Sequence, residues 1–235
     1  MRIKVFGSSN IGLYVAATNK FFLFHSQIPS NKIKMLSEEL KVTGIPIPLV
    51  DTVITTPFLV CNSKGIILPD LFERHAYTEL KQMVESLGVE IELVDHKYNA
   101  LGNTVVANDK GAVVSPVIPL NVKKLLSDVL DVEVSTSTIG RFSYIGSLIS
   151  VNNKVGLVAP VIKDDERDLI ENVLKIKLYE GTINGGLEFI KLGLVVNDYG
   201  VVVGEDSQGV ELMNVSTLFE GGKYVDRGEG IKSNS

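Results

Sequence analysis

The sequence is short of the residues that build disulfides and metal sites. Its 235 residues include one cysteine, Cys61, and three histidines, His25, His75 and His96. A single cysteine cannot form an internal disulfide, and these few residues form no cluster with metal-ligand spacing. We therefore expect a reducing compartment, no bound metal and no cofactor.

Long apolar runs and an excess of basic residues are also missing. No stretch approaches the roughly 18 apolar residues of a membrane helix, and the start of the chain lacks the hydrophobic stretch of a signal peptide. The formal net charge of −5 argues against a face that neutralises many phosphates. The sequence predicts a cytoplasmic protein with no membrane contact and limited direct RNA contact. In a nucleic-acid assembly, a basic protein would be the expected docking point.

The sequence does contain a repeated phrase: a β-prone apolar run, a polar turn of the type Asn-x-Lys-Gly, a second apolar run and usually a proline. Its five copies are anchored at Thr18, Asn62, Asn108, Asn152 and Asn197. The steps between these anchors are 44, 46, 44 and 45 residues, a period typical of propellers and solenoids. We expect one domain over residues 1–225 and a short flexible tail over 226–235.

The third copy indicates the fold of one unit. Residues 104–107 and 112–114 are short β-prone runs, and the Asn-Asp-Lys-Gly turn between them favours a hairpin because Asn, Asp and Gly tolerate positive φ. Apolar residues recur at helical spacing over 120–130, and 132–136 alternates apolar and polar residues. The predicted unit is ββαβ.

Two further patterns concern how the units join. The run Ile3–Phe6 lies where each repeat's last strand lies relative to the next anchor, so we infer that it completes the fifth unit and closes a ring without open edges. Gly12, Gly102 and Gly146 each stand six residues before an anchor, where a bulge or a close backbone approach favours a residue without Cβ.

The copies are also matched in their helices. An apolar residue falls 22 positions after the anchor in four of them, at Leu40, Leu130, Leu174 and Phe219. In the second copy we assign this place to Leu87, 25 positions after Asn62. That spacing predicts an insertion in the second helix.

Three stretches resemble one known family. Tyr98–Asn103, followed by Ala107–Pro116, closely resembles the translation initiation factor 6 family of archaea and eukaryotes. Gly156–Pro160 and Gly181–Asn184 are similar to elements of that family in the fourth and fifth repeats. The resemblance runs from about Val5 to Phe219.

The resemblance implies an α/β pentein fold, with five ββαβ units around a pseudo-fivefold axis and no catalytic activity. Members of the family bind the large ribosomal subunit on its intersubunit face, block joining of the small subunit and act in large-subunit maturation. The implied contact is mainly a uL14-type ribosomal protein close to the sarcin-ricin loop, with release by other factors. An acidic monomer suits such a basic partner.

Three positions depart from the family pattern. Gly185 stands where the family commonly has Arg, Val155 replaces the first glycine of the fourth-repeat element, and Ala159 replaces its His. We expect these changes to leave the fold intact, and they put side-chain roles in the later repeats in question.

Candidate binding residues come from one loop and from the turns. They are Gly12, Lys64, Gly102, Asn103, Asn108, Asp109, Lys110 and Lys154. Asn103 is the first choice, because the resemblance places its loop at the subunit-binding face and an amide both donates and accepts hydrogen bonds; alternatively it braces its own turn. The turn residues are either structural turn formers or contacts, and the lysines either form a positive ring on one face or are simply solvated.

Two other functions are open. Some penteins modify guanidino groups with a cysteine nucleophile in the last repeat, but the fifth repeat here has no cysteine and Cys61 is expected to be an inert thiol. The acidic run Asp164–Glu166 is expected to complement a helix N-terminus. No nucleotide-binding or serine-elbow motif is present. The last alternative is a ring scaffold that binds a non-ribosomal protein.

Overall fold

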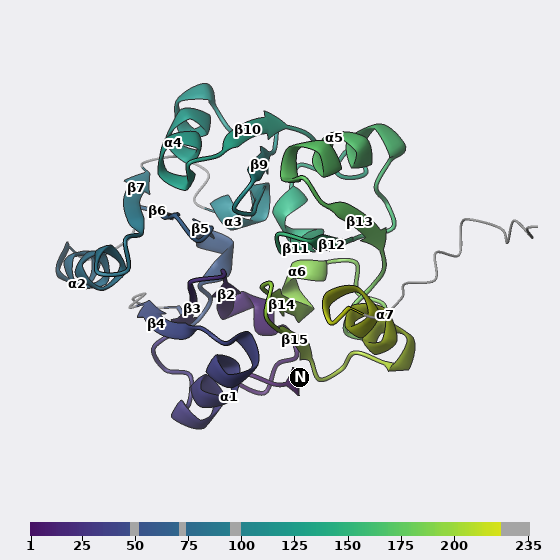
Figure 1. Cartoon of the computed structure of the whole chain (residues 1–235), viewed down its shortest axis with the longest axis horizontal. Helices are drawn as coiled ribbons and strands as arrows, with labels where there is room; N and C mark the ends of the chain where they lie inside the picture. Colours follow the sequence, from purple (N-terminus) through teal and green to yellow (C-terminus); the bar gives the residue numbers. More distant parts are fainter. Residues whose placement is uncertain (48–51, 71–73, 95–99, 222–235) are drawn as a thin grey trace, which may run out of the picture.

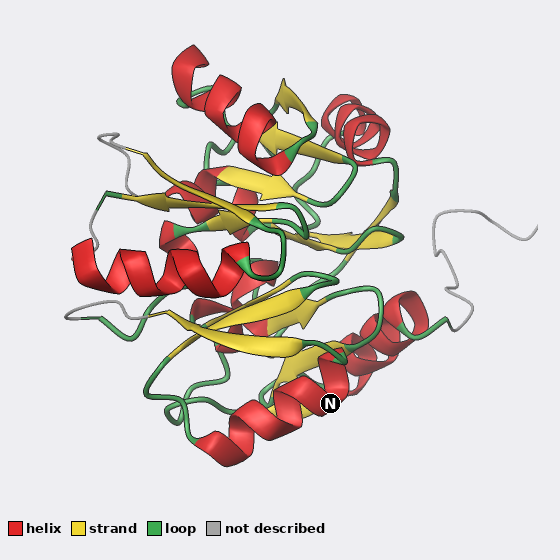
Figure 2. Cartoon of the chain, turned by 60° about the vertical axis from the view of Figure 1, so that its left-hand side comes forward, coloured by secondary structure: helices red, strands yellow, loops and turns green. Residues whose placement is uncertain are grey.

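The computed structural model describes residues 1–47, 52–70, 74–94 and 100–221. They form five three-stranded sheets around one axis, with a helix at the rim of each (Figure 1). Figure 2 shows the sheets inside and the helices outside. This is the α/β pentein architecture that the resemblance implied. The expected domain end at 225 and the tail over 226–235 lie outside the described residues.

Each sheet with its helix is one blade, and the blades follow one another along the chain. Blade 1 contains η1 (Ile11–Leu13), β2 (Val15–Ala17), β3 (Phe21–His25), α1 (Ser30–Leu40) and β4 (Thr43–Ile47). Blade 2 contains η2 (Thr56–Phe58), β5 (Val60–Cys61), β6 (Gly65–Pro69), α2 (Arg74–Glu85) and β7 (Glu90–Val94). Blade 3 contains α3 (Leu101–Thr104), β8 (Val105–Ala107), β9 (Gly111–Val114), α4 (Leu120–Leu130) and β10 (Glu133–Thr136).

The last two blades repeat this order. Blade 4 contains η3 (Ile145–Ser147), β11 (Ile149–Val151), β12 (Val155–Val158), α5 (Asp164–Leu174) and β13 (Lys177–Glu180). Blade 5 contains α6 (Ile190–Gly193), β14 (Leu194–Val196), β15 (Val201–Gly204), α7 (Gly209–Phe219) and, from the start of the chain, β1 (Arg2–Ile3).

Strand pairing confirms the predicted unit. In blade 3, β8 pairs antiparallel with β9 across the polar turn, and β9 pairs parallel with β10 after the helix. The middle strand has a neighbour on each side and is buried along its whole length, which explains its unbroken apolar sequence. The bounds of α4 are those that the helical spacing predicts.

The first strand closes the ring as expected, but it is shorter than predicted. β1 pairs parallel with β15, with Arg2 opposite Val203 and Ile3 opposite Gly204. The predicted strand continued to Phe6, and that part is wrong. Phe6 has a φ of +51°, a conformation that cannot continue a strand, and it lies in a turn.

The hydrophobic core lies between blades more than within them. α4 packs on β6 of the preceding blade, and α5, α7 and α1 pack in the same way on β9, β12 and β15. One core cluster therefore combines Ile67 of blade 2 with Leu126 of blade 3. A blade cut out of the ring would expose much of its apolar surface, so the five must fold as one body.

In the second helix, the buried residue lies at a different distance from the anchor than we expected. Val84, 22 residues after Asn62, is fully buried, whereas Leu87 is 38% exposed. The assignment of Leu87 to the buried place is therefore wrong. The insertion comes after the buried position, where the chain leaves the helix at Gly88 with a φ of +65°. The helical turns before it therefore place their buried residues at the same distance from the anchor as in the other blades.

This register can be tested by truncation. Val84→Ala should lower the free energy of unfolding by about 2 kcal/mol, since it removes fully buried methyl groups. Leu87→Ala should cost less than about 1 kcal/mol, because the side chain is partly solvated. Urea denaturation of both variants measures the difference, and a larger loss for Leu87→Ala would contradict the register.

Candidate binding faces at the two ends of the channel

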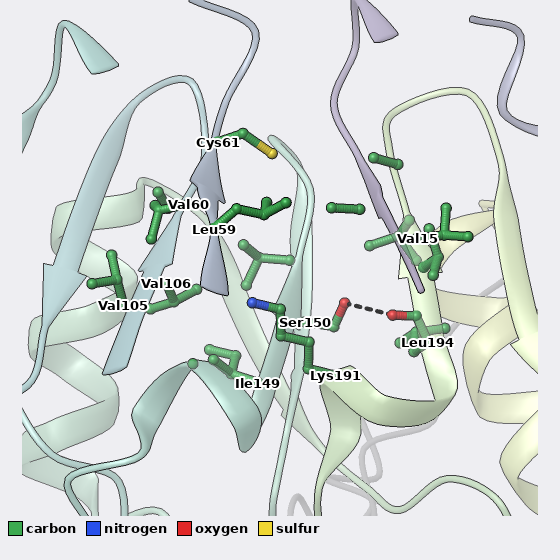
Figure 3. Close-up of a pocket in the computed structure, with 17 residues that line it drawn as sticks. Val15, Leu59, Val60, Cys61, Val105, Val106, Ile149, Ser150, Lys191 and Leu194 are labelled. Carbon is green, nitrogen blue, oxygen red and sulfur yellow. Dashed lines mark hydrogen bonds between the residues drawn. The ribbon is translucent and has the colours of Figure 1, made fainter. Parts of the chain in front are cut away.

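The strands β2, β5, β8, β11 and β14 surround a central cavity of about 100 Å³. We call the end of the ring with the five polar turns the turn face. The opposite end, where the inner strands begin, is the start face. Figure 3 shows Cys61 near the first of these ends and Lys191 near the second.

On the turn face, the buried anchor asparagines join neighbouring blades. Asn108 Oδ1 accepts hydrogen bonds from the backbone N–H groups of Lys110 and Gly111, at 2.9 and 3.1 Å. Its Nδ2 donates to the carbonyl of Asn152, the next anchor, at 3.2 Å. Asn62, Asn152 and Asn197 repeat both bonds. Thr18 closes its own turn through its hydroxyl but has no amide to donate onward.

The residues after the anchors form a second ring, which is closed. Each backbone N–H donates to the side chain of the equivalent residue in the next blade, in the order Asn19, Ser63, Asp109, Asn153, Asp198 and back to Asn19, at 2.7–3.2 Å. Asp109 Oδ2 also accepts from Ser63 Oγ and Asn153 Nδ2. Asn108 and Asp109 are thus occupied inside the protein, as the turn-former interpretation expects.

The candidate lysines lie on this same face, across the seams between blades. Lys64 Nζ donates to Asp131 O and Oδ2. Lys110 Nζ donates to Asn153 O and Lys175 O, and Lys154 Nζ donates to Asp198 O. All these distances are 2.6–3.3 Å. Asp131 and Lys175 are the residues that cap α4 and α5. A lysine at a helix C-terminus is favourable because its charge complements the helix dipole.

The glycine of the repeated turn is required by a close contact with the helix of the next blade. Asn108 Nδ2 also donates to the carbonyl of Leu174, the last residue of α5, at 2.9 Å. This brings the helix end so close that a Cβ on Gly111 would overlap the carbonyl of Val173. Asn62 and Asn197 bind the ends of α4 and α1 in the same way, beside Gly65 and Gly200.

Two turns lack the glycine. Thr18 and Asn152 make no hydrogen bond to a helix end within the described residues, and their turns carry Phe21 and Val155 instead.

On the start face, the residues six positions before the anchors meet around the axis. They are Gly12, Thr56, Gly102, Gly146 and Lys191. A Cβ on Gly102 would overlap the Thr56 carbonyl, and one on Gly146 would overlap the Gly102 carbonyl. The predicted close backbone approach is confirmed. Gly12 and Gly102 are buried at these close contacts.

Lys191 was not singled out from the sequence, although it breaks the glycine pattern. Its Nζ donates to Gly102 O at 2.7 Å across the axis. Burial of the ammonium group lowers the pKa of Lys191 to about 8, against a weaker opposing effect of Cys61. The side chain fills the start of the channel.

Asn103 lies on the start face in α3 and is half-buried. Its backbone N–H donates to Ala100 O at 3.1 Å, and Thr104 Oγ1 donates to Leu101 O at 3.0 Å, so these groups hold the turn. Its side-chain amide has no hydrogen bond to another described residue. Asn103 and Asn108 stand at opposite ends of β8, so one flat partner surface cannot contact both. Tyr98 and Asn99 of the family motif lie outside the described residues.

Two buried glutamates organise the start-face turns of blades 4 and 5. Glu166 accepts from Thr138 Oγ1 at 2.5 Å and from the backbone N–H groups of Gly140, Arg141 and Lys163 at 2.6–3.1 Å. Burial acts to raise the pKa of Glu166, but these hydrogen bonds outweigh it and lower the pKa below its ordinary value. The acidic run does open helix α5, as expected.

Glu211 repeats this arrangement in blade 5. It accepts from Thr182 Oγ1 and from the N–H groups of Gly185, Gly186 and Gln208, at 2.8–2.9 Å, and its pKa is also lowered despite burial. Because the Gly185 contact is a backbone bond, the departure from the family's Arg leaves it in place.

The thiol of Cys61 is poorly suited to catalysis. Burial raises its pKa to about 12, so the nucleophilic thiolate is scarce near neutral pH. His25 is engaged in its own turn, where Nδ1 accepts from Gln27 N at 3.2 Å, while His96 and the side chain of His75 lie outside the described part. Among described residues there is no cluster of metal-binding side chains, and no helix could cross a bilayer.

The chain is similar over nearly its whole length to archaeal proteins. The family model "eIF-6 family" matches residues 1–218. The chain is 40% identical over 224 residues to "Translation initiation factor 6" of Aeropyrum pernix, covering 94% of this chain and 95% of that protein. It is 39% identical over 219 residues to the protein of the same name from Nitrosopumilus maritimus, covering 93% and 98%.

A solved structure is also similar, at a lower level. "SxtG an amidinotransferase from the Microseira wollei in Saxitoxin biosynthetic pathway" has 12% identity and a TM-score of 0.47, over 78% of this chain and 63% of that one.

The seam contact at Gly111 gives a stability prediction. Gly111→Ala should lower the free energy of unfolding by about 1 to 3 kcal/mol, because the added methyl group forces α5 away from the turn. Gly209→Ala is the matched control, since a Cβ there meets open space, and it should be neutral or slightly stabilising. Thermal denaturation compares them, and equal effects would argue against the close seam.

The buried ammonium of Lys191 gives a pH prediction. At pH 7 the group is charged in both states, and burial penalises the folded one. The penalty fades as pH rises from about 8, the folded pKa, to about 10.5, the ordinary value. The free energy of unfolding of Lys191→Met, relative to that of wild type, should therefore be higher at pH 7 than at pH 10. Urea denaturation at both pH values tests this, and a pH-independent difference would contradict it.

Proposed function

Because the chain belongs to the eIF-6 family, we propose that it binds the large ribosomal subunit and keeps the small subunit from joining. The observation that carries this proposal is the match of the eIF-6 family model to residues 1–218. The mechanism is steric: a rigid ring on the intersubunit face leaves no room for the small subunit. A role in large-subunit maturation belongs to the same proposal.

The start face is the surface that docks. Its Asn103 presents a side-chain amide with no hydrogen bond to another described residue, whereas Asn108 and Asp109 on the turn face use theirs inside the ring. Such a half-buried amide gains a hydrogen bond on binding and gives up none that it makes to the described residues. The expected partner is a basic, uL14-type ribosomal protein near the sarcin-ricin loop.

An enzymatic function has less support. Cys61 is the thiol available to a hydrolase or transferase, and its raised pKa keeps it protonated. A monomer in the cytoplasm, released from the subunit by other factors, fits a protein that acts by occupancy alone. The ring-scaffold alternative differs in its partner, so binding to purified subunits separates the two.

The central test is sedimentation with purified archaeal large subunits. Wild type should co-sediment at moderate salt, and Asn103→Ser should bind about tenfold more weakly, the effect of losing about 1.4 kcal/mol. Its melting temperature should not change, since the side-chain amide of Asn103 makes no hydrogen bond to another described residue that the substitution would remove. Asn121→Ser, at an exposed position of α4, is the control.

Three outcomes separate the interpretations. Absence of wild-type binding would contradict the proposed function. A joint fall of binding and stability in Asn103→Ser would mean that Asn103 only braces its turn. Lys110→Ala, on the turn face, should bind as wild type does, and a loss there would assign docking to the opposite face.

A further inference from the structure

Three aromatic rings lie in a row on the start face. Phe142 and Tyr144 are 5.0 Å apart between ring centroids with planes at 24°, and Tyr144 and Phe189 are 5.8 Å apart at 33°. Their exposed fractions are 41%, 36% and 38%. We call these three residues the aromatic patch. It spans the seam between blades 4 and 5 and leaves much of each ring in solvent.

The repeat does not require these rings. The residues eight positions before the five anchors are Asn10, Ile54, Ala100, Tyr144 and Phe189, so only blades 4 and 5 place an aromatic there. The elements that follow, η3 and α6, contact each other, and η3 also contacts α3. The aromatic patch therefore adjoins the segment that carries Asn103.

The surroundings of the patch are acidic. Residues 138–144, 163–166, 182–189 and 205–211 include seven acidic and two basic residues, and Lys4 pairs with two of the seven, Glu205 and Asp206. Glu166 and Glu211 are buried beneath the turns, are held ionised by hydrogen bonds, and have no salt bridge with a described cation. Glu188, beside Phe189, is exposed and also lacks a salt bridge within the described residues. The local field thus favours a cation and disfavours phosphate.

We propose that the aromatic patch receives a loop of a basic partner protein, with a lysine or arginine side chain placed against its rings. A ring face attracts a cation electrostatically, and exposed aromatic residues are enriched where protein interfaces have their strongest contacts. The neighbouring carboxylates supply the matching charge. This inference rests on the proposed function, since the partner protein is sought on the large subunit.

The test uses the full chain and purified archaeal large subunits. Tyr144→Ala/Phe189→Ala should weaken co-sedimentation at least tenfold, with a melting temperature close to that of wild type. Tyr144→Leu/Phe189→Leu keeps apolar volume but removes the rings, and it should also bind more weakly. Tyr199→Ala is the control, because Tyr199 is 51% exposed on the turn face. Wild-type affinity in the leucine variant would overturn the role of the rings.

Charge reversal identifies the kind of partner. Glu188→Lys should weaken binding several-fold, and Arg141→Glu should leave it unchanged or strengthen it. The opposite signs would mean that the patch faces ribosomal RNA, and they would overturn the proposal.

The two proposals fail separately. If Asn103→Ser weakens binding while both double variants bind as wild type does, the patch is not a contact but the proposed function stands. If wild type itself does not co-sediment, both proposals are wrong.

Discussion

The ring depends on a buried side-chain amide that is used twice. In Asn108, Oδ1 closes the turn of its own blade while Nδ2 crosses the seam to Asn152 and to the end of α5. A buried amide left without partners is costly, so a turn and the helix end of the next blade must form together. The core clusters cross the same seams. Secondary structure, core and ring closure are thereby coupled into one cooperative unit.

Because of this constraint, the sequence can vary between the five copies more on one face of the ring than on the other. On the turn face, anchors, following residues and lysines are occupied by bonds between blades, so their sequence repeats. On the start face, the inner ring is held by small residues at the axis, and the surrounding loops can differ from copy to copy. Asn103 and the aromatic patch are such differences, whereas Lys191 is a difference at the axis itself, where its Nζ donates to Gly102 O. Our proposal therefore places recognition on the start face, where the side chain of Asn103 makes no hydrogen bond to another described residue.

Sequence reasoning succeeds here where the pattern lies within one unit. The ββαβ order, the bounds of α4 and the closing strand follow from periods of two and 3.6 and from turn chemistry. It anticipates the closing strand and the close approach of the axial glycines, but it does not identify which residue of another unit a given residue meets. Glycine 111 is explained by a carbonyl in the next blade, and the patch brings together Tyr144 and Phe189, which are 45 residues apart. The error at Leu87 has a related cause, because burial by a neighbouring strand, and not apolarity, fixes the helix phase.

Hydrogen exchange of the protein bound to large subunits tests the central claim, that the start face docks, most directly. We expect added protection in peptides covering residues 100–104, 139–145 and 187–190, with no change over the turns at 62–65, 108–111 and 152–155. Added protection confined to those turns would contradict it, because the docking surface would then be the turn face.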